Sequence, residues 1–315
     1  MRLHIDAWDP SYGVSYDSGV PDAATNAPVD PDVERPASAW QPLLPAADVR
    51  APGSVLLVDG VRRIDARIWV DPEDGTADAH QGICASYAAG VVRCDLAAGV
   101  AQLVGSSVAH AVFAPGPTLS PIAAHPRAVY RPYRVAGPEL AEPELQRRLH
   151  ELEVEVSEAA RRASDELLVV DGPLRGRTSL PGALGYAKTH HKQYLPPELA
   201  RVVPALRPGQ RTPLFSLGAP WNRYSWYLRL PGPEAAPWAG VVRLECAADQ
   251  QLPAAIEYAD VSAVTLPRFA STPYKDPRAP QNLVPIAGLE RRLRALLGDQ
   301  RLLQRGLRLA ATRAA

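Results

Sequence analysis

The chain has few cysteines and no long apolar run. Its three cysteines, Cys84, Cys94 and Cys246, are odd in number, far apart and set in apolar strand-like stretches, so they fit neither a disulfide framework nor a zinc site. We predict three buried thiols. No segment approaches the roughly 20 apolar residues that span a bilayer, and the start, MRLHIDAWDP, lacks the profile of a signal peptide. We therefore expect a cytoplasmic protein with no membrane partner.

Net charge is also absent. The 34 lysine and arginine residues balance 34 aspartates and glutamates, which argues against a histone-like or tail-driven mode of binding nucleic acid. The positive residues are almost all arginine, because lysine occurs only at positions 188, 192 and 275. Arginine favours bidentate contacts with phosphate. The charge balance thus argues against charge-driven wrapping of DNA, but an enzyme that holds DNA in a groove needs only local positive charge.

The amino-acid composition and the apolar pattern change near residue 53. Residues 1–52 mix Asp, Pro, Ser and Ala with few apolar runs. They also carry aromatic side chains that are unusual in a freely disordered tail: Trp8, Tyr12, Tyr16 and Trp40. We interpret them as an extended N-terminal arm that docks on the core or on a second subunit. Residues 53–315 are predicted to form one α/β domain, and the apolar content of 46% is enough for a full core.

Apolar patterns predict the order of elements in that domain. The stretches SVLLVDG, RRIDARIWV and ICASYAAGVVRCD are interpreted as three sequential antiparallel strands, with a further strand near 100–113. Residues 143–164 have apolar residues at helical spacing, and Pro143 suits the first turn of a helix. ELLVVDG follows as a buried strand. Three strands, a helix and a strand is the order of a ribonuclease H-like fold, a mixed sheet flanked by helices.

The remaining sequence gives a few further elements. We predict a helix through GALGYAKTHHKQYL, strands at RYSWYLRL and WAGVVRLECA, and a final helical segment that breaks near Gly298 and Asp299. Aromatic and arginine residues interleave between Trp221 and Arg229. They could stack bases of a single strand, but packing within the core and edge of a strand is the favoured interpretation.

The tripeptide Val-Asp-Gly occurs twice, at 58–60 and 170–172. Each copy closes an apolar run, and arginines follow each copy. A carboxylate at the end of a buried strand is costly to desolvate, and a bound cation is the commonest strong compensation. If the two strands lie side by side, Asp59 and Asp171 can share metal ions. The alternative is that each Asp-Gly pair merely opens a turn. A single copy of the tripeptide would favour the turn, whereas two copies in these strand positions favour the shared metal site.

A third carboxylate is expected from the helix that precedes the second copy. At about 100° per residue, Glu153 and Glu155 each lie about 80° from the apolar stripe of that helix, and the spacing does not choose between them. His190 and His191 are adjacent, so they cannot both face one metal from a helix. We do not favour these histidines as ligands.

The order and spacing of four stretches resemble the NurA nuclease family, over most of the chain from Asp59 to about Arg308. The stretches are VDGVRRIDAR, LLVVDGPL, GYAKTH and, most specifically, YKDPRAPQNLVPIAGLERRLR, which resembles the bacterial branch. The resemblance implies a ribonuclease H-like fold and a homodimer with a central DNA channel. It also implies manganese-dependent exonuclease and endonuclease activity, and partnership with the hexameric HerA ATPase in DNA end processing.

The resemblance also implies site residues. It places the first metal-binding aspartate of the family at Asp59, the later one at Asp171, and the glutamate of the helix at Glu153 or Glu155. Archaeal members have a further histidine near the C-terminus, whereas the corresponding stretch here, NLVPIAGLE, has none.

Residues of the same stretch could take the place of that histidine. Asn282, Asp276 or a water is the expected substitute. In the mechanism that the resemblance implies, two cations about 3.5–4 Å apart activate a water and stabilise the leaving oxygen. Lys188 would neutralise charge on the scissile phosphate. The alternative, given equal weight, is that Lys188 is a surface lysine with no role in catalysis. The residues assigned to DNA contacts are Arg62, Arg63, Arg175, Arg177 and Asn282.

Two other functions fit the same residues. A different ribonuclease H-like nuclease, such as a Holliday-junction resolvase or an Argonaute-type domain, would share the aspartates. A non-catalytic scaffold that binds DNA or HerA is favoured by the missing histidine, whereas Asp59 and Asp171 favour the enzyme. We therefore predict a deoxyribonuclease that depends on Mn²⁺, with Mg²⁺ as the alternative cation.

Overall fold

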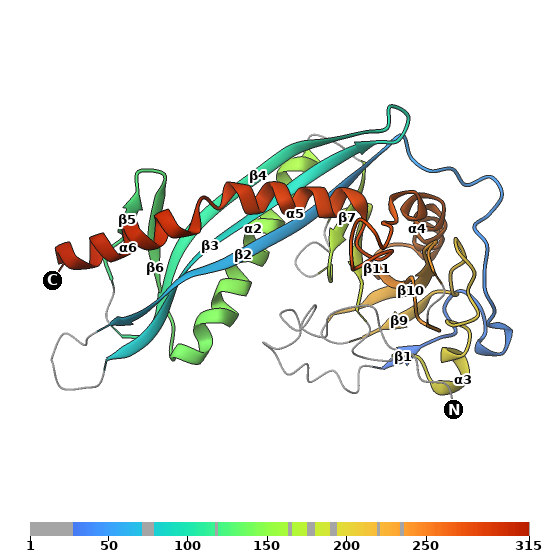
Figure 1. The fold of residues 1–315 in the computed structure, drawn as a ribbon. Helices are drawn as coiled ribbons and strands as arrows, with labels where there is room; N and C mark the ends of the chain where they lie inside the picture. The colour runs from blue at the N-terminus through green and yellow to red at the C-terminus, as the bar shows by residue number, and fades with distance from the viewer. Residues whose placement is uncertain are drawn as a thin grey trace. The chain divides into compact units, whose positions relative to one another are not determined.

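The computed structural model shows a mixed α/β protein in which one large mixed sheet is flanked by helices (Figure 1). This is the fold class that the sequence predicts. The structure describes residues 28–70, 79–116, 119–162, 166–174, 180–189, 194–218, 221–233 and 236–314. Two compact units are present. Of the described residues, unit 1 contains those within Met1–Leu57, Arg93–Gln102 and Ala163–Ala287, and unit 2 contains those within Val58–Val92, Leu103–Arg162 and Gly288–Ala315.

The strands follow one another across the sheet in the order β1-β9-β10-β11-β8-β7-β2-β3-β4-β6-β5. Their bounds are β1 Val29–Asp30, β2 Ser54–Val70, β3 His80–Asp95, β4 Val100–Ala114, β5 Ile122–His125, β6 Ala128–Arg134, β7 Leu167–Asp171, β8 Ala183–Ala187, β9 Phe215–Leu217, β10 Arg223–Arg229 and β11 Val241–Ala247. The central order β4-β3-β2-β7-β8, with a long helix between β4 and β7 along the chain, is that of a ribonuclease H-like core. This order places β2, the first of these strands along the chain, beside β7, the strand that follows the helix.

The helices match the predicted positions at the two places where apolar spacing was clearest. The α-helices are α2 Ala141–Arg162, α3 Pro197–Ala200, α4 Leu252–Thr265, α5 Val284–Leu296 and α6 Gln300–Ala314, and the 3₁₀ helices are η2 Ala37–Ala39, η3 Pro138–Leu140 and η4 Leu266–Phe269. Helix α2 is the predicted long helix, and the predicted break separates α5 from α6 at Gly298, whose φ is +81°. No helix within the described ranges is both long and apolar enough to cross a membrane.

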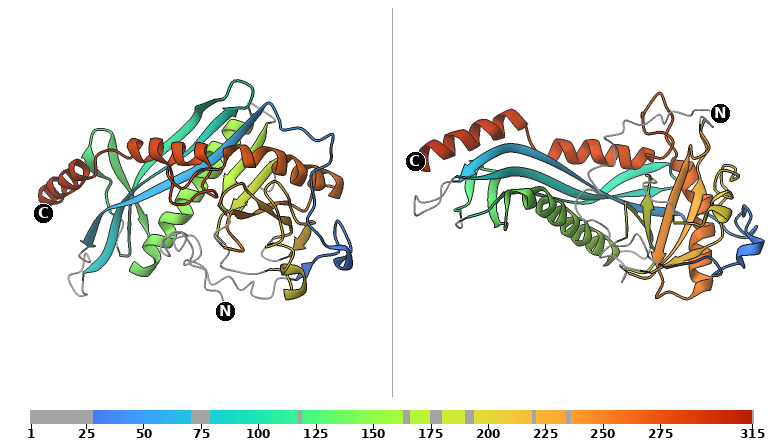
Figure 2. Two further views of the ribbon diagram at one scale, coloured as in Figure 1. Left: turned by 45° about the vertical axis from the view of Figure 1, so that its right-hand side comes forward. Right: turned by 90° about the horizontal axis from the view of Figure 1, so that it is seen from below.

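Within unit 2, helices cover both faces of the long strands. Figure 2 shows α2 on one face of β2, β3 and β4 and α5 on the other. Close packing at two glycines fixes these contacts. A Cβ on Gly60 of β2 would lie 2.8 Å from Leu149 of α2, and a Cβ on Gly90 of β3 would lie 3.0 Å from Leu293 of α5. The absence of a side chain at both positions therefore lets each helix approach the sheet.

The predicted division of residues 54–70 into two strands is wrong. Strand β2 runs through all 17 residues and includes the first Val-Asp-Gly copy. Gly60 does not have a positive φ, and the chain continues in extended form to Val61 and Asp65, which are both buried. The sheet therefore uses Asp59-Gly60 as strand residues, and the turn that an Asp-Gly pair often forms does not occur here.

The helix predicted through GALGYAKTHHKQYL is also wrong in its described part, because residues 183–187 form strand β8. This strand pairs in parallel with β7 and antiparallel with β11. Four of its five residues are buried, so the apolar run fits a strand that has neighbours on both sides. A short apolar run cannot be assigned to a strand or a helix by periodicity alone. His190 and His191 lie outside the described residues.

The core of unit 1 includes the described part of the predicted arm. Trp40 packs on Phe215 with ring centroids 6.3 Å apart, and its indole nitrogen donates to the carbonyl of Pro31. The Arg211 guanidinium is buried between Glu34 and Asp260, at 2.8 Å and 2.6 Å. Residues 28–52 are therefore held on unit 1 by apolar and ionic contacts. The other aromatic residues of the arm, Trp8, Tyr12 and Tyr16, lie outside the described residues.

Two predictions about buried side chains are confirmed. All three cysteines are free and buried, and burial raises the pKa of Cys84 and of Cys246 to about 12. Trp226 and Tyr227 of β10 are also buried, and Trp226 donates from its indole nitrogen to Ser262 of α4. These aromatic rings therefore belong to the core, in agreement with the favoured interpretation of their sequence.

Candidate metal centre

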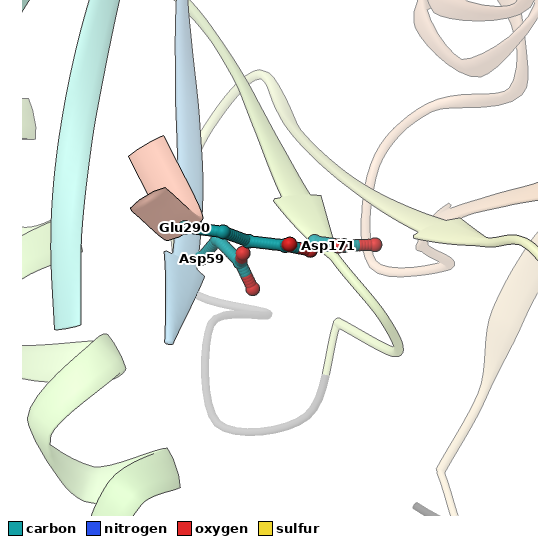
Figure 3. A group of neighbouring side chains, drawn as sticks. All are labelled: Asp59, Asp171 and Glu290. Atoms are coloured by element: carbon teal, nitrogen blue, oxygen red, sulfur yellow. The ribbon is translucent and has the colours of Figure 1, made fainter. Parts of the chain in front are cut away.

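Three carboxylate side chains lie close together: Asp59 in β2, Asp171 at the end of β7 and Glu290 in α5 (Figure 3). One oxygen atom of each lies within 4.8 Å of the others. Asp59 is buried and the other two are half-buried. Divalent cations such as Mg²⁺ bind oxygen ligands at roughly 2.0–2.6 Å, so three oxygens at this spacing can surround one cation. The all-oxygen donor set suits magnesium, calcium and manganese.

Strand β2 delivers Asp59 to this cluster directly from the core. Leu56, Leu57 and Val58 are fully buried, and Asp59 is the next residue along the strand. Its Oδ1 atom accepts a hydrogen bond of 2.7 Å from the backbone N–H of Gly60. Because the strand is fixed by its buried residues, the carboxylate is fixed as well.

Strand β7 places Asp171 beside a lysine. Asp171 is paired with Tyr186 in the parallel β7–β8 ladder, and Lys188 follows two residues after Tyr186. The Lys188 Nζ atom donates to the Asp171 Oδ2 atom. Burial raises the pKa of Tyr186 well above its ordinary range, and the negative charge of Asp171 raises it further. Tyr186 therefore stays a neutral phenol, and its hydroxyl donates to the Gln281 carbonyl at 2.7 Å.

The turn after Asp171 is held by a buried carboxylate. Gly172 has a φ of +111°, a backbone conformation that glycine adopts without steric cost. The backbone N–H of Leu174 then donates to the Oε1 atom of Glu245 at 2.8 Å. Burial would raise the pKa of Glu245, but the charges of Arg243 and Arg223 and this backbone hydrogen bond lower it overall. Glu245 is therefore ionised and can anchor the turn.

Helix α5 supplies Glu290, which is not among the site residues predicted from the sequence. Ile286, Leu289 and Leu293 form the buried face of this helix, and Glu290 lies at the edge of that face. A signal was present, because Glu290 is the last residue of the NLVPIAGLE stretch, where a replacement for the missing histidine is expected. The spacing from Ile286, one helical turn earlier, would have placed Glu290 on the sheet side.

The two glutamates predicted from α2 are not among these three carboxylates. Glu155 is exposed. Glu153 is buried, and its Oε1 atom would lie 2.3 Å from a Cβ on Gly60, so it packs against β2 next to Asp59. His150 Nδ1 lies 3.7 Å from Glu153 Oε2. A direct metal contact by Glu153 or Glu155 stays a prediction.

The residues predicted to contact DNA have diverse surroundings. The Arg62 side chain is 23% exposed and lies 4.0 Å from Glu142. Arg63 is engaged within unit 2, because its Nε donates to Asp65 at 2.7 Å and its Nη1 donates to the Gly298 carbonyl at 2.9 Å. Arg175 and Arg177 lie outside the described residues. The DNA-contact roles of these arginines stay predictions.

Asn282 is fully buried beside the candidate site. Its Oδ1 atom accepts from Lys188 Nζ at 2.8 Å, and its Nδ2 atom donates to Asp276 at 2.6 Å. Neither Asn282 nor Asp276 belongs to the cluster of Asp59, Asp171 and Glu290. Of the two residues predicted as substitutes for the histidine, Asn282 contacts Lys188 directly and Asp276 contacts Asn282.

Comparison with known proteins gives weak similarities. No protein-family model matches the chain, and no curated protein sequence matches it. The solved structure of the NurA nuclease from Sulfolobus solfataricus is similar at 10% identity and a TM-score of 0.46, covering 82% of this chain and 86% of that chain. An endonuclease V from Bacillus subtilis is similar at 14% identity and a TM-score of 0.34, covering 80% of this chain and 86% of that one. Similarity this low carries no functional assignment, which must come from the side chains.

Proposed function

We propose that this protein is a metal-dependent deoxyribonuclease whose catalytic cation is held by Asp59, Asp171 and Glu290. The observation that carries the proposal is the clustering of one oxygen from each side chain within 4.8 Å. Ionised carboxylates this close repel one another, and a shared cation removes that repulsion. When bound, a divalent cation supplies an activated water and neutralises charge on a phosphodiester.

Lys188 supports a phosphate substrate. Its ammonium group contacts Asp171 and is therefore next to the proposed cation. A positive charge at this position can bind a non-bridging oxygen of the scissile phosphate and stabilise the charge that develops during cleavage. Asp59, Asp171 and Glu290 would hold the cation, Asp171 would also retain the lysine that it contacts here, and Lys188 would contact the substrate.

Manganese is the proposed cation, with magnesium as the alternative. The resemblance of the sequence to NurA nucleases implies manganese, and the carboxylate donor set accepts either ion. The same resemblance supports proposals about the wider assembly. These are a homodimer around DNA, action on DNA ends together with a HerA-type hexameric ATPase, and a cytoplasmic location. For a chain of 33.9 kDa, light scattering of the purified protein at micromolar concentration should give about twice this mass.

The non-catalytic scaffold is less well supported than it was from sequence alone. Its main support was the missing histidine in NLVPIAGLE, and Glu290 now supplies a carboxylate from that stretch. A scaffold would have no need for three clustered carboxylates and an adjoining lysine. The enzyme is therefore the preferred function.

A cleavage assay tests the proposal. Wild-type protein is incubated with single-stranded and double-stranded DNA in manganese, in magnesium and in EDTA, and we expect cleavage that EDTA abolishes. E290Q should lose cleavage while remaining folded. The matched control is D260N, which changes a buried carboxylate in the Arg211 ion pair and lies outside the proposed metal site. Cleavage in EDTA, or an E290Q rate equal to that of wild type, contradicts the assignment.

A further inference from the structure

Four side chains in unit 1 form a linear chain of hydrogen bonds that ends at the candidate metal site. Asp276 Oδ2 accepts from Asn282 Nδ2 at 2.6 Å, Asn282 Oδ1 accepts from Lys188 Nζ at 2.8 Å, and Lys188 Nζ donates to Asp171. Asn282 and Asp276 come from the segment before α5, whereas Lys188 follows β8. The chain of hydrogen bonds therefore joins two parts of the sequence that are 94 residues apart at Lys188 and Asn282.

The chemistry at the two ends of Asn282 fixes the orientation of its amide. An ionised carboxylate only accepts hydrogen bonds, and an ammonium group only donates them. The NH₂ group of Asn282 must therefore face Asp276, and its carbonyl oxygen must face Lys188. Asn282 has no exposed surface, so water does not compete for either contact. A flipped amide would place donors against a donor and lose both hydrogen bonds.

Asp276 is held in the charged form that this arrangement requires. Burial would raise the pKa of Asp276, but hydrogen bonds from Asn282 and from the backbone N–H of Arg278, together with the Arg278 charge, lower it overall. The Arg278 N–H donates to Asp276 Oδ1 at 2.8 Å. The carboxylate is thus fixed by its own turn and presents its other oxygen to Asn282.

We infer that Asp276 and Asn282 are positioning residues that hold the Lys188 ammonium group for contact with the scissile phosphate. The inference rests on the proposed nuclease function for the role of Lys188, but the hydrogen-bonded chain itself does not. A lysine side chain has high rotational freedom, and fixing it before substrate binds removes an entropic cost from the reaction.

Competition for Asp171 explains why a second anchor is useful. Asp171 would have to share its negative charge between Lys188 and a bound cation, which would weaken the ion pair. The contact from Lys188 to Asn282 does not involve Asp171, so it would remain available with a cation bound. Asn282 is neutral and therefore holds the lysine without cancelling the charge that the phosphate needs.

The first experiment observes Lys188 directly, without any cleavage. Because the chain contains lysine only at positions 188, 192 and 275, protein labelled with ¹⁵N-lysine gives one side-chain ammonium signal for each of them in an NMR spectrum. The K188R variant identifies the signal of Lys188, which hydrogen bonding and burial should protect from exchange with water. In N282A this signal should move or broaden, both in magnesium and without it. In D260N it should be unchanged.

The second experiment exchanges the two functional groups. N282D alone sets two carboxylates against each other, whereas the double variant D276N/N282D swaps carboxylate and amide and can re-form both hydrogen bonds. We expect N282A and N282D to lower the single-turnover cleavage rate by about 10- to 100-fold, the usual cost of losing an outer-shell partner. The DNA dissociation constant and the metal dependence should be unchanged. The double variant should be faster than N282D and slower than wild type, because both hydrogen bonds re-form while the carboxylate at position 282 partly cancels the lysine charge.

The outcomes are distinguishable. An unchanged Lys188 signal in N282A overturns the inference, as does a double variant no faster than N282D. A changed signal with a wild-type cleavage rate also overturns it, because Lys188 then needs no positioning. If wild-type protein does not cleave DNA while N282A still alters the Lys188 signal, the proposed nuclease function fails and the hydrogen-bonded chain stands.

Discussion

The two Val-Asp-Gly copies have the same sequence and different backbones. In the first copy, Asp59 and Gly60 lie inside a 17-residue strand, and Gly60 packs under Glu153 and Leu149 of α2. In the second copy, Asp171 is the last residue of β7, and Gly172 turns the chain with a φ of +111°. The first glycine leaves room for the Glu153 and Leu149 side chains, whereas the second adopts a backbone angle that favours glycine.

This difference shows that one tripeptide can fix the position of a carboxylate while its neighbours determine the backbone. In both copies four apolar residues precede the aspartate and are buried, which brings the carboxylate to the edge of the core. The segments after the two aspartates differ, because α2 covers β2 beyond Asp59, whereas Glu245 anchors the turn after Asp171. The two copies thus share an aspartate placed at the end of a buried apolar run, and they differ in how the glycine and the residues after it pack.

The largest expected effect tests what the two copies share. D59N and D171N should each lower the cleavage rate by at least about 100-fold, above the usual range for outer-shell residues, because each removes a charged metal ligand. Both variants should stay folded, since asparagine keeps the shape of the side chain. Cleavage assays and manganese titrations measure the two effects. A wild-type rate with intact manganese affinity in either variant would show that its aspartate is not a ligand.

The next effect separates the two glycines. G60A and G172A should each destabilise the protein by about 1–3 kcal/mol, the first through overpacking and the second through backbone strain. Urea unfolding of single and double variants distinguishes the causes. Adding E153A should recover part of the stability of G60A, because a Cβ there would lie 2.3 Å from Glu153 Oε1, and should leave G172A unchanged. Equal recovery in both would contradict the distinction.

A smaller effect concerns the arginines that follow each copy. The double variant R62Q/R175Q should bind DNA more weakly, and the log-log slope of affinity against salt should become shallower by about 0.7–0.9 for each phosphate that is no longer neutralised. R93Q is the matched comparison, because Arg93 is paired with Glu166 and is not among the arginines predicted to contact DNA. It should keep the salt dependence of wild type. An unchanged slope in R62Q/R175Q would place the DNA path elsewhere.

The smallest expected effect concerns the part of β2 that continues beyond Asp59 to Val70. The second copy has no such continuation, because β7 ends at Asp171. There, Asp65 accepts hydrogen bonds from Ser86 and Tyr130, and Ser86 contacts His110 Nδ1 at 2.7 Å. Burial lowers the pKa of His110 from 6.5, an effect larger than the opposing pull of Asp65.

This lowered pKa gives a prediction with a definite sign. The unfolded chain protonates His110 more readily than the folded chain does, so stability should fall as the pH drops below about 6.5. Urea unfolding across this range measures the effect, and H110Q should lose that part of the pH dependence. An H110Q profile parallel to that of wild type would mean that His110 does not contribute.

Sequence patterns predicted the elements whose periodicity was long or whose ends were marked. Helix α2 and the break at Gly298 followed from apolar spacing and a glycine, and the strands carrying Asp59 and Asp171 followed from continuous apolar runs. Strand β8 could not be predicted in the same way, because the run ALGYA is short enough for either element. Its neighbours β7 and β11 decide its conformation, and such pairing is not visible in a local pattern.

The candidate site was predictable only in part, for the same reason. Asp59 and Asp171 could be selected because each follows a buried run within its own strand. Glu290 comes from a helix more than 100 residues later, and its approach depends on how α5 packs on β3 through Gly90. The contacts of Asn282 with Lys188 and Asp276 likewise depend on tertiary structure, so the sequence could indicate the residue and not its partner.

The buried cysteines make the protein a convenient host for a reporter dye. The thiolate is the form that reacts with maleimides, and burial raises the pKa of Cys84 and Cys246 to about 12 and that of Cys94 to about 11. At neutral pH almost none of the native sulfur is reactive. A single cysteine introduced at an exposed helix position such as Ala311 of α6 would therefore be labelled selectively in the otherwise unaltered chain, which would allow DNA association to be followed by fluorescence.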